Sequence, residues 1–358
     1  MSLDVFQANF GRLRGASVAL ACLLAALPLA LAACAPSGAT SGGSSSGTLT
    51  PVTLALDWTP NTNHTGIYVA QAQGYYKQQG IDLKLTPYSS QVAPEQLVTT
   101  NQADFAISFP EAITTLRAQG QPLVSVAAVI QSNTSALISL KSSGLDTVAS
   151  LAGKRYAGFG APYEQPIISQ MLSCAGATNT SFQNVTTQLD PIAALKSGQF
   201  DFAWIYLGWE GIEAQRQGIA LNTFALADYC IPDYSSPVII SNQQFIQQHP
   251  DIIKRFMKAT AEGYEYTIQH PDDAAKLLMQ GAPKGSFDDQ QLVIKSQEYL
   301  SPLYAPGEKC WGMQSQASWT NYPRFMFDHH AIQDANGNPI TKAPDYNAAF
   351  TNQFLPAC

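Results

Sequence analysis

Aromatic, amide and carboxylate side chains gather in four short segments of this 358-residue chain, residues 57–66, 108–111, 160–164 and 204–210. Three of the five tryptophans lie in these segments. Aromatic faces stack on a planar ring, and Glu or Asn side chains hydrogen-bond its edge, so the pattern predicts a site for a heteroaromatic molecule. The candidate contacts are Trp58, Asn61, Ser108, Phe109, Tyr163, Glu164, Tyr206, Trp209, Glu210 and Tyr234.

Many of these side chains also have a structural alternative. Large aromatic residues fill the core between sheets and helices, and we expect Tyr75 and Tyr76 to do so. For His64, which precedes a predicted helix, a capping or hydrogen-bonding role is favoured over ligand contact. The adjacent His329 and His330 point to different faces of a helix, so we expect no metal site. The sequence also lacks a G-x-S-x-G motif and a P-loop, so no catalytic residues are predicted.

Alternating strands and helices must position the four segments. The predicted strands are 52–58, 81–85, 103–108, 123–130, 155–158, 202–206 and 238–241. The predicted helices are 66–79, 94–100, 110–119, 165–175, one from 208 onward, 251–270 and 314–330. Strands that alternate with helices form mostly parallel sheets flanked by helices, so the fold class is α/β.

The strand–helix pattern restarts after residue 140, which predicts two lobes. The apolar segments 135–140 and 236–241 are natural crossings between the lobes. The first lobe would then comprise residues 51–140 and 241–358, and the second lobe residues 141–240. Ligands of open α/β sheets bind beyond the carboxyl ends of strands, where the four segments lie, so we expect a ligand cleft between hinged lobes.

Residues 1–33 have the features of a lipoprotein signal peptide. Two arginines precede an apolar run over residues 16–33, and the sequence Leu-Ala-Ala-Cys ending at Cys34 matches a bacterial lipobox. Cys34 is therefore the expected lipidated N-terminus, and residues 34–50 form a flexible Gly/Ser-rich tether. A plain signal peptide or a short membrane anchor is the alternative. We expect a lipid-anchored protein on the extracytoplasmic face of the cell membrane.

Four cysteines remain in the predicted mature body, Cys174, Cys230, Cys310 and Cys358. An oxidising compartment favours disulfides, and four cysteines allow three pairings. We expect Cys174–Cys230 and Cys310–Cys358, because each pair would fall within one lobe.

The composition excludes several classes of protein. Charged residues make up 13% of the chain, and the formal net charge is −7; an average soluble domain has about 25% charged residues. The chain is too acidic and too poor in charge to bind nucleic acid through its phosphates. The low charge also argues against an anionic substrate.

The chain resembles the THI5/NMT1-like substrate-binding proteins in four segments: LDWTPNTNHTGIYVAQAQGYYKQQGI, NQADFAISFPEA, FAWIYLGWEGIEA and DYCIPDYSSPVIIS. The resemblance extends from about residue 52 to the end. It implies the two-lobe fold of type II periplasmic binding proteins. It also implies a small-molecule ligand and, as partners, the permease and ATPase of an ABC importer.

The family that the chain resembles also contains a pyrimidine synthase that uses pyridoxal phosphate. At the position that Ser108 occupies in this chain, the enzyme branch that it resembles has a lysine. That branch also has a histidine near the position of Ala112 and a cysteine cluster near residues 232–236, and this chain has neither. Serine cannot form the Schiff base with the cofactor. We therefore expect no enzyme activity and no cofactor.

Two ligands fit the resemblance, riboflavin and the aminopyrimidine precursor of thiamine. The aromatic segment 204–210 favours the larger flavin ring, although an aromatic loop can also narrow a cleft for a small ring. Riboflavin is the preferred hypothesis, with the aminopyrimidine as the alternative and a sulfonate-type ligand or another small heteroaromatic less favoured. A lipoprotein sensor without a transport role is the alternative of another class. We expect a monomer.

Overall fold

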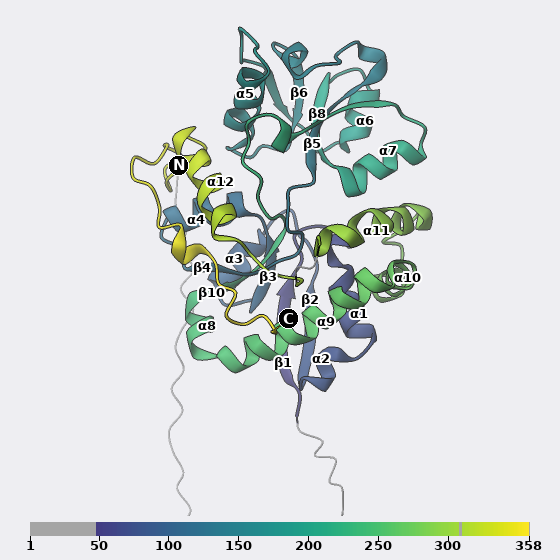
Figure 1. Cartoon of the computed structure of the whole chain (residues 1–358), viewed down its shortest axis with the longest axis vertical. Coiled ribbons are helices and arrows are strands. Elements are labelled where there is room, and N and C mark those ends of the chain that lie inside the picture. The colour runs from purple at the N-terminus through teal and green to yellow at the C-terminus, as the bar shows by residue number, and fades with distance from the viewer. Residues whose placement is uncertain (1–47, 308–309, 358) are drawn as a thin grey trace, which may run out of the picture. The chain divides into compact units, whose positions relative to one another are not determined.

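The computed structural model describes residues 48–307 and 310–357, and their strands form two five-stranded sheets (Figure 1). The first sheet has the order β2-β1-β3-β10-β4. Its strands are β1 (Thr50–Ala55), β2 (Ile81–Thr86), β3 (Phe105–Ser108), β4 (Leu123–Ala128) and β10 (Val238–Asn242). The second sheet has the order β7-β6-β8-β5-β9. Its strands are β5 (Ser135–Leu140), β6 (Arg155–Gly158), β7 (Gln183–Thr186), β8 (Phe202–Tyr206) and β9 (Leu221–Ala225).

Each sheet has four strands in one direction and a single reversed strand. The reversed strands are β10 in the first sheet and β5 in the second, and each is antiparallel to both of its neighbours. Each is also the first strand after the chain passes from one sheet to the other. The predicted mostly parallel α/β architecture is confirmed. Because β5 already pairs within the second sheet, the chain leaves the first sheet before Ser135, a few residues earlier than the sequence pattern indicated.

Helices cover both sheets, and we call each sheet with its helices a lobe. Figure 1 shows α5 on one side of the second sheet and α6 and α7 on the other. The helices of the second lobe are α5 (Glu164–Cys174), α6 (Pro191–Lys196) and α7 (Ile212–Arg216), the last preceded by the π-helical turn η4 (Leu207–Gly211). Those of the first lobe are α1 (Thr65–Ala72), α2 (Tyr75–Gln78), α3 (Pro94–Thr99), α4 (Pro110–Ala118), α8 (Gln243–Gln248), α9 (Pro250–Gln269), α10 (Pro271–Gly281), α11 (Gln290–Tyr304) and α12 (Gln316–Asp328).

The helix predicted over residues 66–79 is broken at Gly74. This residue adopts a left-handed conformation with φ of 75°, which glycine reaches without a steric penalty, so α1 ends and α2 begins there. Tyr76 on α2 is buried in the core, and its hydroxyl forms a hydrogen bond with the Thr260 hydroxyl, with the two oxygens 2.8 Å apart. Its predicted packing role is confirmed.

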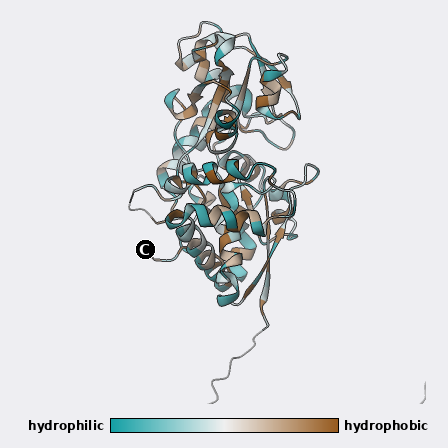
Figure 2. Ribbon diagram, turned by 90° about the vertical axis from the view of Figure 1, so that its right-hand side faces the viewer, coloured by the Kyte–Doolittle hydropathy of each residue, from teal (hydrophilic) through white to brown (hydrophobic). Residues whose placement is uncertain are grey.

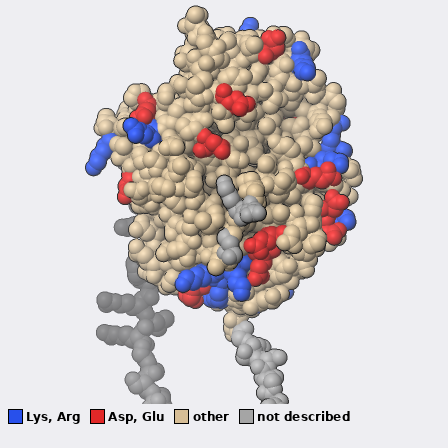
Figure 3. Space-filling model, in the orientation of Figure 1, with Lys and Arg blue, Asp and Glu red and all other residues tan. Residues whose placement is uncertain are grey.

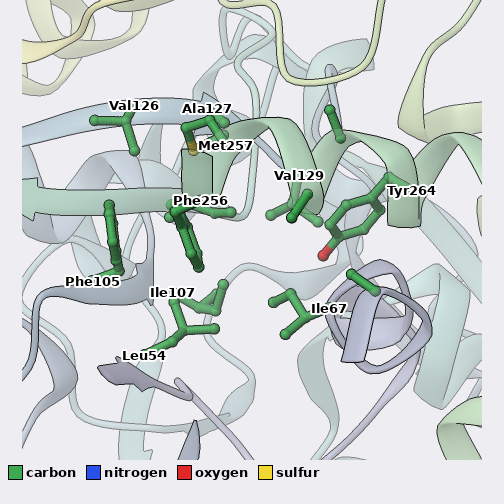
Figure 4. Close-up of a cluster of buried hydrophobic side chains, with 14 of the residues drawn as sticks. Leu54, Ile67, Phe105, Ile107, Val126, Ala127, Val129, Phe256, Met257 and Tyr264 are labelled. Atoms are coloured by element: carbon green, nitrogen blue, oxygen red, sulfur yellow. The ribbon is translucent and has the colours of Figure 1, made fainter. Parts of the chain in front are cut away.

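Helix α9 supplies the core of the first lobe. Figure 4 shows Phe256, Met257 and Tyr264 from this helix beside apolar side chains of the strands, among them Phe105 and Ile107. The rings of Phe105 and Phe256 stack with their centroids 4.0 Å apart. Figure 2 shows hydrophobic residues in the strands and helices in which hydrophobic and hydrophilic residues alternate. Burial of this apolar surface is the main favourable contribution to folding.

Charged residues are sparse on the face of the molecule that Figure 3 shows, as they are in the sequence. Figure 3 shows Lys, Arg, Asp and Glu scattered over one face, most of which is formed by other residues. Within the described part of the chain, no helix is both long and apolar enough to cross a membrane.

The predicted Cys174–Cys230 disulfide is confirmed and joins the last residue of α5 to the segment after β9. The predicted Cys310–Cys358 pairing involves Cys358, which lies outside the described residues, so it stays a prediction. The same holds for the signal peptide and for lipidation of Cys34, which fall within residues 1–47.

Candidate functional site

The loop after β1 is held in place by its own polar side chains. Asn61 accepts a hydrogen bond from the Asn63 N–H (2.9 Å), and its amide donates to the Thr59 carbonyl (3.1 Å). His64 is fully buried, with Nδ1 3.3 Å from the Asn61 backbone nitrogen and Nε2 2.7 Å from Asp57 Oδ1. These bonds form a capping box around the short helix η1 (Thr62–His64). The predicted capping role of His64 is confirmed, and the loop already uses both polar ends of the Asn61 amide.

Trp58 is the aromatic residue of this loop whose side chain is exposed to solvent. Its side chain is 51% exposed, and its ring lies 4.7 Å from that of Tyr88 at an angle of 44°. An exposed indole beside a tyrosine offers an apolar face on which another ring can stack. Trp58 therefore stays a predicted ligand contact.

The turn from β3 into α4 buries the next candidate residues. Ser108 is fully buried, and its hydroxyl donates to a carboxyl oxygen of Glu95 on α3. Burial raises the pKa of Glu95, and the bond from Ser108 opposes this rise. Phe109 is half-buried and precedes Pro110, the first residue of α4. The Ser108 hydroxyl thus already has an acceptor inside the first lobe.

Glu111, the second residue of α4, was not among the predicted contacts and occupies a distinctive position. Its side chain is buried, and its Oε1 accepts hydrogen bonds from the hydroxyls of Tyr234 and Tyr322, the latter at 2.8 Å. The two tyrosine rings stack with their centroids 3.6 Å apart. The other oxygen, Oε2, is buried and has no hydrogen-bond partner among the described residues. Burial raises the pKa of Glu111, and the two tyrosine hydroxyls offset part of this rise.

In the second lobe, Glu164 organises the loop after β6. Its Oε1 accepts hydrogen bonds from the Tyr156 hydroxyl (2.7 Å) and the Phe159 N–H (2.9 Å). Its Oε2 accepts from the N–H groups of Gly160 (2.8 Å) and Ala161 (2.7 Å). The fully buried carboxylate therefore positions this loop, and direct contact with a ligand would replace one of these bonds.

Aromatic rings surround the end of that loop. The ring of Tyr163 is half-buried and lies 6.0 Å from the ring of Phe159 and 6.4 Å from that of Trp204. Phe159 is 49% exposed, whereas Trp204 is only 7% exposed and belongs to the core of the second lobe. Among these rings, Phe159 and Tyr163 are the ones that a ligand can reach.

The segment after β8 carries Tyr206, Trp209 and Glu210. Tyr206 is 38% exposed, and its backbone N–H donates to Glu210 Oε2 at 3.0 Å. Burial raises the pKa of Glu210 to about 7, against the opposing effect of its backbone hydrogen bonds. The ring of Trp209 lies 6.4 Å from that of Phe287 in the first lobe and is half-buried.

Carboxyl groups of the first lobe affect the pKa values of two tyrosines in the second. Burial raises the pKa of Tyr163, and Glu111 and Glu95 of the first lobe raise it further. Burial and the charges of Glu111, Asp57 and Glu210 likewise raise the pKa of Tyr206. Negative charge disfavours the phenolate form, so both phenols stay neutral.

Hydrogen bonds thus join the predicted contact Tyr234 to Glu111, and the predicted contacts Tyr206 and Glu210 to each other. They also add Glu95 and Tyr322, which sequence reasoning missed, and Glu111, which lies in the predicted segment 108–111 but was not named as a contact. A signal for Glu111 was present, because an acidic residue after a proline opens the helix that follows β3. Within residues 48–307 and 310–357, no group of three or more His, Cys, Asp or Glu residues is suited to a metal ion.

Comparison with known sequences places this site in context. Residues 61–274 match the protein-family profile described as NMT1/THI5 like. The formylaminopyrimidine-binding protein of Halalkalibacterium halodurans is 29% identical over 289 residues, covering 80% of this chain and 87% of that protein. The 4-amino-5-hydroxymethyl-2-methylpyrimidine phosphate synthase of Legionella pneumophila is 25% identical, covering 85% and 92%. The riboflavin-binding protein RibY of Chloroflexus aurantiacus is 25% identical, covering 86% and 87%.

A solved structure shares the fold. The putative periplasmic sulfonate-binding protein SsuA of Methylobacillus flagellatus superimposes with a TM-score of 0.60 at 17% identity. The match covers 86% of this chain and 93% of that protein. At this identity the likeness concerns the two-lobe architecture alone.

Proposed function

The chain belongs to the NMT1/THI5-like family, and we propose that it is the substrate-binding component of an ABC importer for a planar heteroaromatic compound. One observation carries this proposal: the segments at the carboxyl ends of β1, β6 and β8 leave the rings of Trp58, Phe159 and Tyr206 exposed, while α4 buries the Glu111 carboxyl with one oxygen that has no partner among the described residues. Aromatic faces and a carboxyl group supplied by opposite lobes can hold a flat ring by its faces and its edge. Hinge closure of the lobes around the ring would form the complex that docks on the permease.

The aminopyrimidine precursor of thiamine is the ligand that the site geometry favours. The sequence favoured riboflavin because the segment 204–210 is rich in aromatic residues, but Trp204 lies in the core and Trp209 packs beside Phe287. A small ring needs less apolar surface, and its amino group is a donor for the carboxyls at the site. The relative from H. halodurans is named for binding a formylaminopyrimidine, which supports this ranking.

Riboflavin is the second candidate, for a specific reason. Trp58, Phe159 and Tyr206 are 51%, 49% and 38% exposed, so together they offer more open aromatic surface than a pyrimidine would cover. The relative RibY is named for binding riboflavin.

We propose no enzyme activity and no cofactor, although the relative from L. pneumophila is named as a synthase. Ser108 occupies the position at which the enzyme branch that the chain resembles has its lysine. The Ser108 hydroxyl donates a hydrogen bond to Glu95. A serine hydroxyl cannot form a Schiff base with an aldehyde, so this position cannot hold pyridoxal phosphate covalently.

The proposal includes the cellular setting. The protein would be a monomer on the extracytoplasmic face of the membrane, anchored through lipid on Cys34, with the importer's permease and ATPase as partners. A lipid anchor followed by a tether would keep the binding lobes near the permease.

Ligand titration tests the proposed function. Purified protein is titrated with 4-amino-5-hydroxymethyl-2-methylpyrimidine by calorimetry and with riboflavin by quenching of flavin fluorescence. We expect saturable binding of the aminopyrimidine at one site per chain. Binding of riboflavin alone would reverse the ranking, and binding of neither compound would refute the proposed function.

A further inference from the structure

We propose that Oε2 of Glu111 is the specificity-determining contact of the site, accepting a hydrogen bond from an N–H group on the edge of the bound ring. The site would then select heteroaromatic compounds that carry an exocyclic amine or a ring N–H. This inference rests on the proposed function and names the chemical feature of the ligand that the site recognises.

The two oxygens of the Glu111 carboxyl differ in their hydrogen bonding. Oε1 accepts two bonds, from the Tyr234 and Tyr322 hydroxyls, whereas Oε2 is buried and accepts none among the described residues. Glu111 as a whole is only 4% exposed. Buried polar atoms in folded proteins nearly always have a partner, so an oxygen without one is expected where a ligand supplies the donor.

The carboxyl is also held in a fixed orientation. Tyr234 lies in the segment that leads into β10, and Tyr322 lies on α12, so the two donors reach Oε1 from separate elements. Their rings stack at an interplanar angle of 7°, and both side chains are buried. With Oε1 fixed by two hydroxyls, the position of Oε2 is fixed too. A fixed acceptor discriminates between ligands because it does not adapt to a ring that lacks the donor.

The Glu111 carboxyl itself suits a ligand that donates hydrogen bonds. It is buried, and the two groups that bond to it, the hydroxyls of Tyr234 and Tyr322, are both neutral donors. Carboxylates accept hydrogen bonds and repel anions. An amine at the edge of a pyrimidine, or the N3–H of a flavin, would satisfy Oε2, whereas a phosphate group would meet negative charge.

The experiment compares two ligands that differ by one amino group, 4-amino-5-hydroxymethyl-2-methylpyrimidine and 5-hydroxymethyl-2-methylpyrimidine. Both are titrated into the wild-type protein, Glu111→Gln and the matched control Glu265→Gln, an exposed carboxyl on α9. We expect the wild type and the control to prefer the amine by about tenfold to a hundredfold, the usual range for a hydrogen bond to a charged group. In Glu111→Gln the ratio of the two affinities should fall to nearly one. The amide oxygen keeps the two tyrosine donors, so the N–H₂ group takes the place of Oε2, and this group accepts no hydrogen bond.

The outcomes separate the inference from the proposed function. If the wild type binds both compounds equally, or if Glu111→Gln keeps the full preference, the role of Glu111 is refuted while the binding function stands. Equal binding of the two compounds by the wild type refutes the role even if the variant fails to fold. If the protein binds riboflavin instead, 3-methylriboflavin, which lacks the N3–H, replaces the deaminated compound. If no ring compound binds, both proposals are refuted.

Discussion

Arg216 and Asp289 form a two-point ion pair between the lobes. Arg216 Nε lies 2.9 Å from one carboxyl oxygen of Asp289, and Nη2 lies 2.8 Å from the other. Arg216 ends α7 of the second lobe, whereas Asp289 precedes α11, which packs on α9 and α10 of the first. The same carboxylate caps α11 by accepting hydrogen bonds from the N–H groups of Gln291 (3.0 Å) and Leu292 (3.1 Å). One side chain therefore both begins a helix and joins the lobes.

The two roles of Asp289 predict unequal effects of substitution on stability. Arg216→Ala removes only the partly exposed ion pair, which we expect to cost at most about 1 kcal/mol. Asp289→Ala also removes the helix cap, which adds about 1 kcal/mol. Urea unfolding of the wild type, both single variants and the double variant measures these free energies. Equal losses in the two single variants would show that the cap contributes nothing.

Trp58 and Trp204 should respond in opposite ways to truncation. Trp58 is 51% exposed, so Trp58→Ala should leave the free energy of unfolding almost unchanged while it weakens ligand binding by about tenfold, through loss of ring stacking. Trp204 is 7% exposed in the core of the second lobe, so Trp204→Ala should cost about 3–5 kcal/mol of stability. Calorimetric titration and urea unfolding measure the two effects.

Val185 provides the control for this comparison. It is 45% exposed on the edge strand β7, so Val185→Ala should change neither the affinity nor the stability appreciably. Unchanged ligand affinity in Trp58→Ala would remove Trp58 from the site.

Strands were predictable where they are buried and were missed where they are not. The strands β3, β4, β8 and β10, which are buried along most of their length, and β1, which has three buried residues, all have apolar runs that predict a strand. All four residues of β7 are exposed, and β9 buries only Phe224, so neither edge strand has the apolar alternation that marks a strand. Tertiary pairing with β6 and β5 forms them instead.

The candidate site was predictable in position but not in detail. The rule that ligands bind beyond the carboxyl ends of strands identified the segments that carry Tyr163 and Tyr206. It could not show that Glu164 binds its own loop, because that depends on where four donors point. Nor could it reveal Tyr322, which reaches Glu111 across 211 residues of sequence.

Close packing of α1 against α9 depends on glycine. A Cβ atom added to Gly263 would lie 2.0 Å from the Gly66 carbonyl oxygen and 2.8 Å from the Ala70 Cβ atom. Gly263→Ala should therefore force the helices apart and cost about 1–3 kcal/mol or more. At Gly211 an added Cβ atom would meet Leu207 at 3.5 Å, an ordinary contact, so Gly211→Ala is the matched control for stability. Thermal unfolding of both variants measures the difference, and equal melting temperatures would contradict the proposed close contact.

Glu210 should make the stability of the protein depend on pH. Its pKa rises from 4.5 to about 7, mainly because the carboxyl is buried, so the folded chain binds this proton more tightly than the unfolded chain does. The contribution to stability is therefore full below pH 4.5 and is lost as the pH rises to about 7. The shift corresponds to at most about 3 kcal/mol.

Glu210→Gln isolates this effect, because the amide does not titrate and the other buried carboxyls remain. The free energy of unfolding is measured by urea for both proteins from pH 4 to pH 8. Relative to the variant, the wild type should lose stability between about pH 4.5 and pH 7 and remain level above that range. Parallel pH profiles for the two proteins would show that Glu210 titrates normally, as a carboxyl group exposed to water would.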